Sequence, residues 1–375
     1  MGSIGEPEAA VPSAIPVVDF SKWNKSVDKD DQFAVAKELT EACRKVGFVY
    51  IINHGLSQDL LDQAFDTGKR LFALSHDEKM QAPHPPGHEV HRGYSHPGLE
   101  KVSQYMGGKE DDEEVGERLR EITDCKESYE IGSQDDKLQP NVWLPERTLP
   151  GFQDFTLKFY WECHKVALSI LRAMALGIGL SEQDFFEKFH SGNNCQLRLL
   201  HYPPVPAANI ESERMARMPA HTDWSTITML FQDDCGGLEV EDPHAPGKFV
   251  PATPVPGACV VNVGDMLMRW SNGKPSASSL VNLILTIQVD YLKSTLHRVG
   301  LPPLSDRFEG EQRMSRPRYS IPFFVSPDAD ALVEVLQPCT SASNPAKYEP
   351  ITQFEYGMMR QSTQYRKNEP TAALA

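Results

Sequence analysis

The sequence lacks a hydrophobic run long enough to cross a bilayer. The longest, near Leu280–Val289, falls well short of the roughly 20 apolar residues that a transmembrane helix needs. Met1–Ser13 has neither the basic start nor the apolar centre of a signal peptide. Glu6 also stands where a myristoylation motif requires Ser or Thr. We therefore expect no membrane attachment.

Positive charge is scarce as well. Lys and Arg number 37 against 52 Asp and Glu, and the formal net charge is −15. A surface of this sign repels a phosphate backbone, so nucleic acid is excluded as a partner. With 375 residues, of which 40% are hydrophobic, the chain can bury the large core of a globular protein. We expect a monomer.

Paired or metal-binding cysteines are missing too. The seven cysteines are odd in number and scattered, without CxxC or Cys/His zinc spacing. Such cysteines are typical of reduced thiols that pack as small hydrophobic side chains. The sequence therefore predicts a cytoplasmic protein without a disulfide framework.

Hydrophobic periodicity predicts helices in the first half of the chain and closely spaced strands in the second. The first half is expected to hold strands Ala14–Phe20 and Gly47–Asn53 and helices Asp30–Val46, Leu56–Leu74, Leu149–Leu176 and Ser181–Phe189. Strands are expected at Gln196–Tyr202, Thr226–Phe231, Leu238–Glu241, Ala258–Val263, Thr295–Val299 and Arg318–Val325. This spacing favours a β-sandwich or barrel, followed by a helical tail around Thr352–Tyr365.

The chain accordingly divides into four regions. Residues 14–135 form an N-terminal region of helices and strands that packs on the core, and residues 136–193 a long-helix linker. Residues 194–326 form the β core, with a suspect insert at 273–290, and residues 327–375 the C-terminal helical tail.

One motif has the residues of a metal site. His221-Thr-Asp223 stands at the start of one β-rich run, and His297 lies in a later one. Alternate side chains on a strand face the same way, so His221 and Asp223 are expected to point together into the β core. Two histidines and one carboxylate form a face that binds ferrous iron and leaves positions open for substrate and oxygen. The similar motif at His76–Glu78 is interpreted instead as a helix start capped by Ser75.

A second motif supports this interpretation. Arg318-Tyr-Ser320 places a guanidinium and a hydroxyl on one face of a strand, where together they can hold a carboxylate. Tyr202, which precedes two prolines, can add a third contact. A lone arginine would indicate a surface salt bridge, but an arginine beside an iron site favours the recognition of a carboxylate.

Ordered motifs along almost the whole chain resemble one family. They are IPVVDF, GFVYIINHGL, KESYEIG, LRLLHYPP, AHTDWSTITMLFQDD, GGLEV, VVNVGDMLMRWSN, STLHRV and RYSIPFF. In these motifs the chain is similar to the isopenicillin N synthase-like, 2-oxoglutarate-dependent Fe(II) oxygenases of the fungal type. The resemblance implies an α+β fold with a mainly β core, a double-stranded β-helix (jelly roll) with flanking helices.

The resemblance also implies an activity. The chain would be a non-haem iron dioxygenase that uses Fe(II), 2-oxoglutarate and O2 to hydroxylate, desaturate or cyclise a small organic molecule in fungal specialised metabolism. The implied metal ligands are His221, Asp223 and His297, and the implied cosubstrate contacts are Arg318, Ser320 and Tyr202. Leu200 departs from plant members, which often carry Asn near the cosubstrate.

Other residues near these motifs have weaker assignments. Trp224, beside Asp223, is a candidate for the substrate pocket, and so are Arg92 and Tyr94 in the long Gln81–Gly108 loop. Met266 and Met268 alternate as on a strand and are expected in the core. Gly236-Gly237 is expected to form a turn.

The segment SNGKPSASSLVNLILTIQVDYLKSTLHRV holds an apolar run that the family pattern lacks. In that pattern RWSN runs almost directly into YLKSTLHRV, and replacing Gly273–Asp290 by a single Asp restores the spacing. The codons of this segment permit a 5′ splice signal, a branch point and a 3′ splice end in frame. We therefore hypothesise a translated intron, which sequencing of cDNA tests. The alternative is a genuine substrate-covering loop.

Two other functions remain open at this stage. An isopenicillin N synthase-type oxidase draws its electrons from the substrate alone and would use the Arg-x-Ser pair to grip a substrate carboxylate. A catalytically inactive form or binding module would result if the insert at 273–290 displaced His297. Succinate formation separates the dioxygenase from both.

Overall fold

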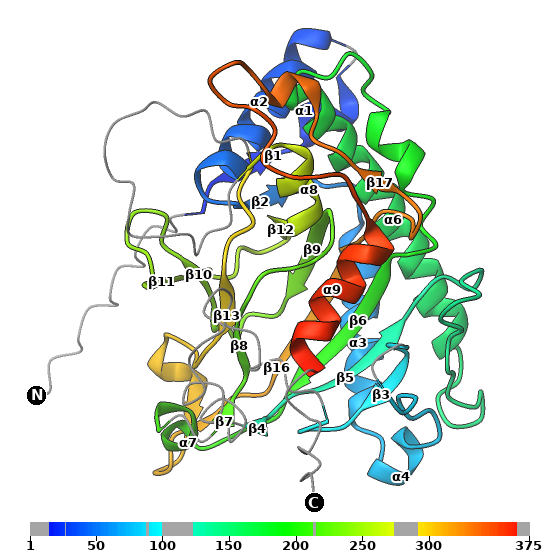
Figure 1. The fold of residues 1–375 in the computed structure, drawn as a ribbon. Helices are drawn as coiled ribbons and strands as arrows, with labels where there is room; N and C mark the ends of the chain where they lie inside the picture. The colour runs from blue at the N-terminus through cyan, green and yellow to red at the C-terminus, as the bar shows by residue number, and fades with distance from the viewer. Residues whose placement is uncertain are drawn as a thin grey trace, which may run out of the picture.

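The computed structural model describes residues 15–26, 28–87, 90–99, 123–212, 215–273 and 292–365. Two sheets form the centre of the fold (Figure 1). The large sheet has the strand order β1 (Val17–Asp19), β2 (Phe48–Ile52), β12 (Cys259–Val263), β9 (Ile227–Gln232), β16 (Arg318–Val325), β6 (Gln196–Tyr202), β5 (Glu127–Ile131), β3 (Gly93–Ser95). The small sheet has the order β11 (Phe249–Pro251), β10 (Leu238–Glu241), β13 (His297–Val299), β8 (Met218–His221).

Helices cover the outer face of the large sheet, away from the small sheet (Figure 1). They are α2 (Lys29–Lys45), α3 (Gln58–Phe72) and the long α6 (Phe152–Ile178). Shorter helices are α1 (Ser21–Lys25), α4 (His76–Lys79), α7 (Ala207–Glu211), α8 (Asp265–Trp270) and the C-terminal α9 (Gln353–Tyr365). None of the helices in the described ranges is long and apolar enough to span a membrane.

Within the described residues, the remaining elements are three small strand pairs and three 3-10 turns. The pairs are β4 (Thr123–Asp124) with β7 (Met215–Ala216), β14 (Phe308–Glu309) with β15 (Met314–Ser315), and β17 (Leu332–Val333) with β18 (Ile351–Thr352). The turns are η2 (Phe185–Phe189), η3 (Ser305–Arg307) and η4 (Gln337–Cys339). The architecture is an α+β fold around a double-stranded β-helix, as the sequence resemblance implied.

The register of the large sheet separates its two faces. Tyr319 on β16 pairs with His201 on β6, which in turn pairs with Glu127 on β5. The rings of Tyr319 and His201 lie beside Phe72 of α3, so this row faces the helices. Because successive side chains on a strand alternate, the residues on either side of this row point between the two sheets. The inner face, between the two sheets, is therefore where a buried functional site can form.

Three sequence expectations need correction. The segment Asp265–Trp270 is a short helix rather than a strand, although Met266 and Met268 are buried as expected. The segment from Ser181 contains a 3-10 turn that begins only at Phe185. Strands β3 and β5 were not predicted, because the first lies in a loop-like sequence rich in Gly and Pro and the second, ESYEI, has polar or charged residues at three of its five positions. In contrast, Ser75 caps its helix with Glu78 in a capping box.

The ends of the suspect insert meet in the fold. Residues 274–290 of the hypothesised translated intron lie outside the described residues, but Gly273 and Leu292 on either side of them are described. A side-chain carbon on Gly273 would collide with the carbonyl oxygen of Leu292, and the Leu292 backbone N–H donates to Ser271 Oγ at 3.2 Å. The chain can therefore pass from Gly273 to Leu292 over a very short connection.

A buried polar cluster fastens the helices to the outer face of the sheet. The Glu127 carboxylate accepts from Lys79 Nζ (2.8 Å), from the Tyr94 hydroxyl (2.6 Å) and contacts His201 Nδ1 (2.7 Å). Burial raises the pKa of Glu127, but these three contacts outweigh burial and hold the pKa below its usual value. The cluster joins α4, β3, β5 and β6 around one carboxylate.

We expect Glu127→Gln to lower the free energy of unfolding by roughly 3 kcal/mol at neutral pH, because it leaves the Lys79 charge buried without its partner. Because the folded-state pKa of Glu127 is depressed, its contribution is present above the ordinary Glu pKa and is lost as pH falls through the folded-state value. Urea unfolding of the parent protein and of Glu127→Gln, at neutral and at acidic pH, measures the difference in the free energy of unfolding. Glu239→Gln, which breaks the half-exposed pair with Arg298, is the control and should cost below about 1 kcal/mol. If Glu127→Gln and Glu239→Gln lowered the free energy of unfolding by the same amount, the prediction would be wrong.

We also expect the protein to fold when Gly273–Asp290 is replaced by a single Asp. The two ends already meet, and closing a shorter loop costs about 1–2 kcal/mol less conformational entropy. Thermal unfolding followed by circular dichroism should show a midpoint at or above that of the full chain. A shortened chain that fails to fold would show that the segment contributes to the core.

Candidate metal centre and cosubstrate site

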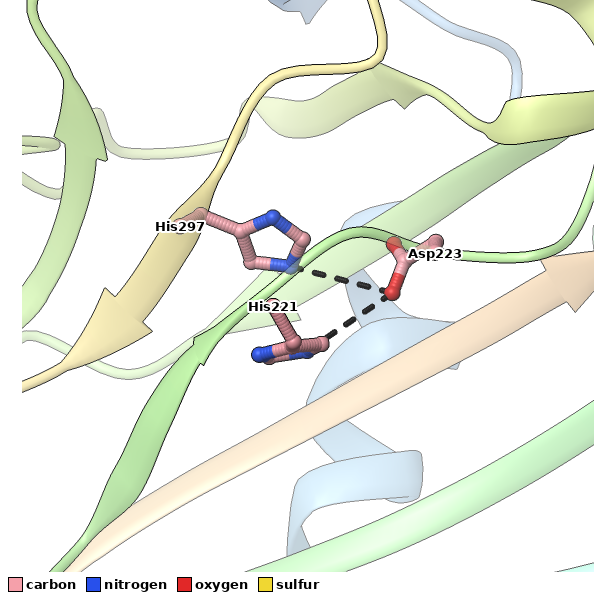
Figure 2. A group of neighbouring side chains, drawn as sticks. All are labelled: His221, Asp223 and His297. Atoms are coloured by element: carbon pink, nitrogen blue, oxygen red, sulfur yellow. Dashed lines mark ion pairs between the residues drawn. The ribbon is translucent and has the colours of Figure 1, made fainter. Parts of the chain in front are cut away.

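Two neighbouring strands of the small sheet bring the predicted metal ligands together. His221 at the end of β8 pairs directly with His297 at the start of β13, and their ring centroids are 4.3 Å apart. The carboxylate of Asp223 reaches between them: its Oδ1 is 3.7 Å from Nε2 of each histidine (Figure 2). Asp223 itself follows the end of β8 and lies outside any strand, so the expected strand alternation does not orient it. His297 takes this place despite the long segment that precedes it.

Neighbouring backbone carbonyls orient both imidazoles. Nδ1 of His221 lies 2.8 Å from the carbonyl oxygen of Pro219, and Nδ1 of His297 lies 3.2 Å from that of Thr295. A carbonyl can only accept, so Nδ1 carries the proton and Nε2 keeps a free lone pair directed toward Asp223. This orientation is the one that metal-binding histidines need.

The large sheet orients the carboxylate. Oδ2 of Asp223 accepts from Thr228 Oγ1 on β9 at 2.6 Å and from Asn262 Nδ2 on β12 at 2.7 Å. Both donors use the same oxygen, which leaves Oδ1 for the histidines. Thr228 and Asn262 were not among the residues expected at the site, although the strand motifs TITML and VVNVGD contain them.

The protonation states suit a cation. Burial, followed by the proximity of His297, lowers the pKa of His221 to about 4, so this imidazole is neutral at neutral pH. Burial raises the pKa of Asp223, but the two histidines and its hydrogen bonds outweigh burial and keep the pKa below its usual value. Two imidazoles and one carboxylate on one face match the ligand set of non-haem Fe(II) oxygenases. Within the described ranges this is the one group of three such residues whose ligand atoms all lie within 4.8 Å.

The second predicted motif, Arg318-Tyr-Ser320, places Arg318 and Ser320 on the inner face of the large sheet. Arg318 on β16 pairs with Tyr202 on β6, and its guanidinium lies 5.0 Å from the Tyr202 ring centroid. Its Nη1 donates to Ser320 Oγ at 3.0 Å and its Nη2 to Gln232 Oε1 at 3.3 Å. Arg318 is 1% exposed, so it is no surface salt bridge, and its Nε has no acceptor. A buried guanidinium without a bound carboxylate fits a site for the distal carboxylate of 2-oxoglutarate.

Apolar packing joins this motif to the strands of the metal centre. Tyr202 and Leu200 belong to the same buried cluster as Met218 of β8 and Val299 of β13. Leu200, the position that departs from plant relatives, pairs with Ser320 and is 5% exposed. An apolar side chain therefore lies beside the proposed carboxylate site.

The candidate substrate residues divide into two groups. Trp224 follows Asp223 and is half-buried under the guanidinium of Arg360, 5.3 Å from its ring centroid. Arg92 pairs with Asp136 at 2.9 Å, and the Tyr94 hydroxyl bonds Glu127. Both lie on the helix-covered face of the large sheet, where strand alternation directs them away from the metal centre. The structure therefore packs Trp224, the residue after Asp223, against Arg360 and the main core, and it does not bring Arg92 or Tyr94 to the site.

Sequence reasoning missed a polar row on the inner face. Arg198 pairs with Glu130, at 3.1 Å between Nε and Oε1, and its guanidinium lies 5.8 Å from the Phe324 ring centroid. Phe324 pairs across the sheet with Thr228, the donor to Asp223. Arg198 lies two strands from β9 and level with Leu230, two residues from Thr228, so Arg198 and Thr228 are roughly 12 Å apart. The signal was available, because Arg198 lies an even number of residues from Tyr202 on one strand.

The C-terminal helix reaches the metal centre through one buried carboxylate. Asp265 Oδ2 accepts from Arg360 Nη1 (2.8 Å) and from the Tyr356 hydroxyl (2.7 Å), both on α9. Its Oδ1 accepts from Ser294, close to His297, at 2.6 Å, and its backbone N–H donates to the carbonyl of Asp223 at 2.8 Å. Asp265 thus connects α9 with both segments that carry metal ligands.

Comparisons with known proteins agree with this site. Residues 193–327 match the family model of the 2OG-Fe(II) oxygenase superfamily, and residues 15–146 match that of the N-terminal region of non-haem dioxygenases, named for morphine synthesis. The 2-oxoglutarate-dependent dioxygenase htyE of Aspergillus rugulosus is 35% identical over 94% of this chain and 99% of its own length. The proline hydroxylase buaE of Petromyces alliaceus is 37% identical over 88% of this chain and 93% of its own length.

A solved structure shows the same fold. A full-length Neurospora crassa protein, solved in complex with alpha-KG and thymine, superposes with a TM-score of 0.77 at 33% identity, covering 94% of this chain and 97% of that one. The chain therefore belongs to the 2-oxoglutarate/Fe(II) oxygenase superfamily, in its isopenicillin N synthase-like branch, and is a 2-oxoglutarate-dependent dioxygenase.

Proposed function

We propose that His221, Asp223 and His297 hold the Fe(II) ion of this dioxygenase and that Arg318, Ser320 and Tyr202 hold the distal carboxylate of 2-oxoglutarate. The observation that carries the proposal is the convergence of two correctly oriented Nε2 atoms on one carboxylate oxygen. When bound, iron and 2-oxoglutarate activate O2 with release of carbon dioxide and succinate.

The protein's own residues orient the metal ligands and the cosubstrate and keep water away from them. Carbonyls of Pro219 and Thr295 fix the imidazole protons, and Thr228 and Asn262 fix the carboxylate. The buried Arg318 neutralises one end of the cosubstrate, so its other end is directed toward the metal. The packed inner face excludes water from the reacting atoms.

The substrate is a small organic molecule, and we propose that it lies between Trp224 and the Arg198–Glu130 pair. This region combines the Trp224 ring, next in sequence to Asp223, with a polar pair roughly 12 Å from Thr228, a span that suits one amino acid or heterocycle. The relatives include a proline hydroxylase, and the solved neighbour holds thymine. These names support a small polar substrate for this chain, in specialised metabolism.

We further propose a cytoplasmic monomer with no nucleic-acid or membrane partner. All seven cysteines are buried thiols, which favours a reducing compartment. The net charge of −15 opposes binding to phosphate backbones and anionic lipid. The four regions 14–135, 136–193, 194–326 and 327–375 remain our proposed division of the chain.

Two alternatives find less support. An inactive module is disfavoured because His297 keeps its place beside His221, so the suspect insert does not dismantle the ligand set. An oxidase without 2-oxoglutarate is disfavoured because the curated relatives named above include a 2-oxoglutarate-dependent dioxygenase matched over nearly the whole chain.

The function is tested by the visible charge-transfer band that Fe(II) and 2-oxoglutarate form together under anaerobic conditions. We expect the band in the parent protein and succinate formation on admission of air. Arg318→Met should weaken 2-oxoglutarate binding by about 10- to 100-fold, since it removes a charge-assisted contact of about 1.5–3 kcal/mol. Ser320→Ala should weaken it by about fivefold, as for a neutral hydrogen bond of about 1 kcal/mol. Iron binding without any band in the parent would refute the cosubstrate site.

The contacts of Asp265 generate a second prediction. Arg360→Gln should weaken Fe(II) binding by about tenfold, because it disturbs the carboxylate that supports both ligand segments. Equilibrium titration of Fe(II) measures the affinity. Arg269→Gln is a matched control, since Arg269 also lies over the Tyr356 ring but donates to the Glu349 carbonyl rather than to Asp265. Identical iron affinities in all three proteins would show that α9 is not coupled to the metal centre.

A further inference from the structure

A second guanidinium is buried beside the proposed cosubstrate site. Arg217, directly before β8, is 0% exposed. Its Nη2 donates to Ser315 Oγ at 2.8 Å and to the Arg316 carbonyl at 3.1 Å, while its Nε and Nη1 have no acceptor. No carboxylate of the described residues pairs with it. Only polar neutral groups therefore surround a fully buried positive charge.

Arg217 and Arg318 share one aromatic neighbour. The guanidinium carbon of Arg217 lies 6.0 Å from the centroid of the Tyr202 ring, and that of Arg318 lies 5.0 Å from the same centroid. They come from different sheets, since Arg217 leads into β8 and Arg318 begins β16. Two positive charges thus converge on the ring that lines the proposed site.

The surrounding acids do not balance this charge. Asp233 is the acid whose charge acts on Arg318, but its carboxylate accepts the backbone N–H groups of Tyr319 (2.6 Å) and Cys235 (3.0 Å). Burial raises the pKa of Asp233, although the charge of Arg318 opposes this shift. Burying an unpaired charge costs several kcal/mol, so a ligand anion is needed to complete the site.

We propose that Arg217 is a second cationic residue of the cosubstrate site, acting with Arg318 to select a dianionic 2-oxo acid over a monoanionic one. The inference rests on the proposed location of 2-oxoglutarate. The hydrogen bonds to Ser315 and Arg316 hold the guanidinium behind Tyr202, and its charge attracts the distal carboxylate. A purely structural arginine would treat both classes of 2-oxo acid alike.

The experiment compares 2-oxoglutarate with 2-oxopentanoate, which has the same chain length without the distal carboxylate. Anaerobic titration of the Fe(II) protein, followed by the charge-transfer band, gives the Kd of each. We expect Arg217→Met to raise the Kd of 2-oxoglutarate by about tenfold and to leave that of 2-oxopentanoate within about twofold. Arg217→Lys, which keeps the charge, should recover most of the affinity for 2-oxoglutarate.

Controls separate this inference from the others. Arg316→Met removes a neighbouring arginine that pairs with Asp234 at the surface and should change neither Kd. If Arg217→Met does not fold, Ser315→Ala, which loosens the Arg217 guanidinium, should raise the 2-oxoglutarate Kd alone by about threefold. If Arg217→Met lost affinity equally for 2-oxoglutarate and 2-oxopentanoate, or lost no affinity for either, the proposed role of Arg217 would be wrong. In either case a band in the parent protein would leave the proposed function standing.

Discussion

The site depends on a buried carboxylate whose two oxygens serve different partners. Asp223 directs Oδ2 to Thr228 and Asn262 of the large sheet and Oδ1 to the histidines of the small sheet. A carboxylate is stable in such a place only when hydrogen bonds and positive charge compensate its lost hydration. The same requirement that holds the two sheets in register therefore prepares a cation site between them.

The C-terminal helix is included in this arrangement through Asp265. That carboxylate accepts from α9 on one oxygen and from Ser294 on the other, and its N–H holds the backbone of Asp223. Elements from distant parts of the chain thereby share one electrostatic network. Positions that look peripheral, such as Arg360, can then influence the geometry of the metal ligands.

Charge also explains how one face can serve three ligands. The metal end carries a carboxylate and two imidazoles, and the Tyr202 end carries buried guanidinium groups. The Arg198–Glu130 pair joins strands β5 and β6 and has no net charge. These charges suit the cation, the dianion and the small polar molecule that we propose for the three places. Ordinary strand alternation separates all of these groups from the aromatic and aliphatic core under the helices.

The sequence by itself determined the ligand types, the strand positions of Arg318–Val325 and Gln196–Tyr202, and the family, because these follow from local spacing and ordered motifs. It could not show that Asp223 leaves the strand, that Arg92 and Tyr94 face the helices, or that Met266 and Met268 lie on a helix. These outcomes depend on sheet register and on contacts between residues far apart in the chain. Arg217, Arg198 and Arg360 belong to the same class: each is an ordinary arginine in the sequence, and only the tertiary structure decided which buried partners it would have.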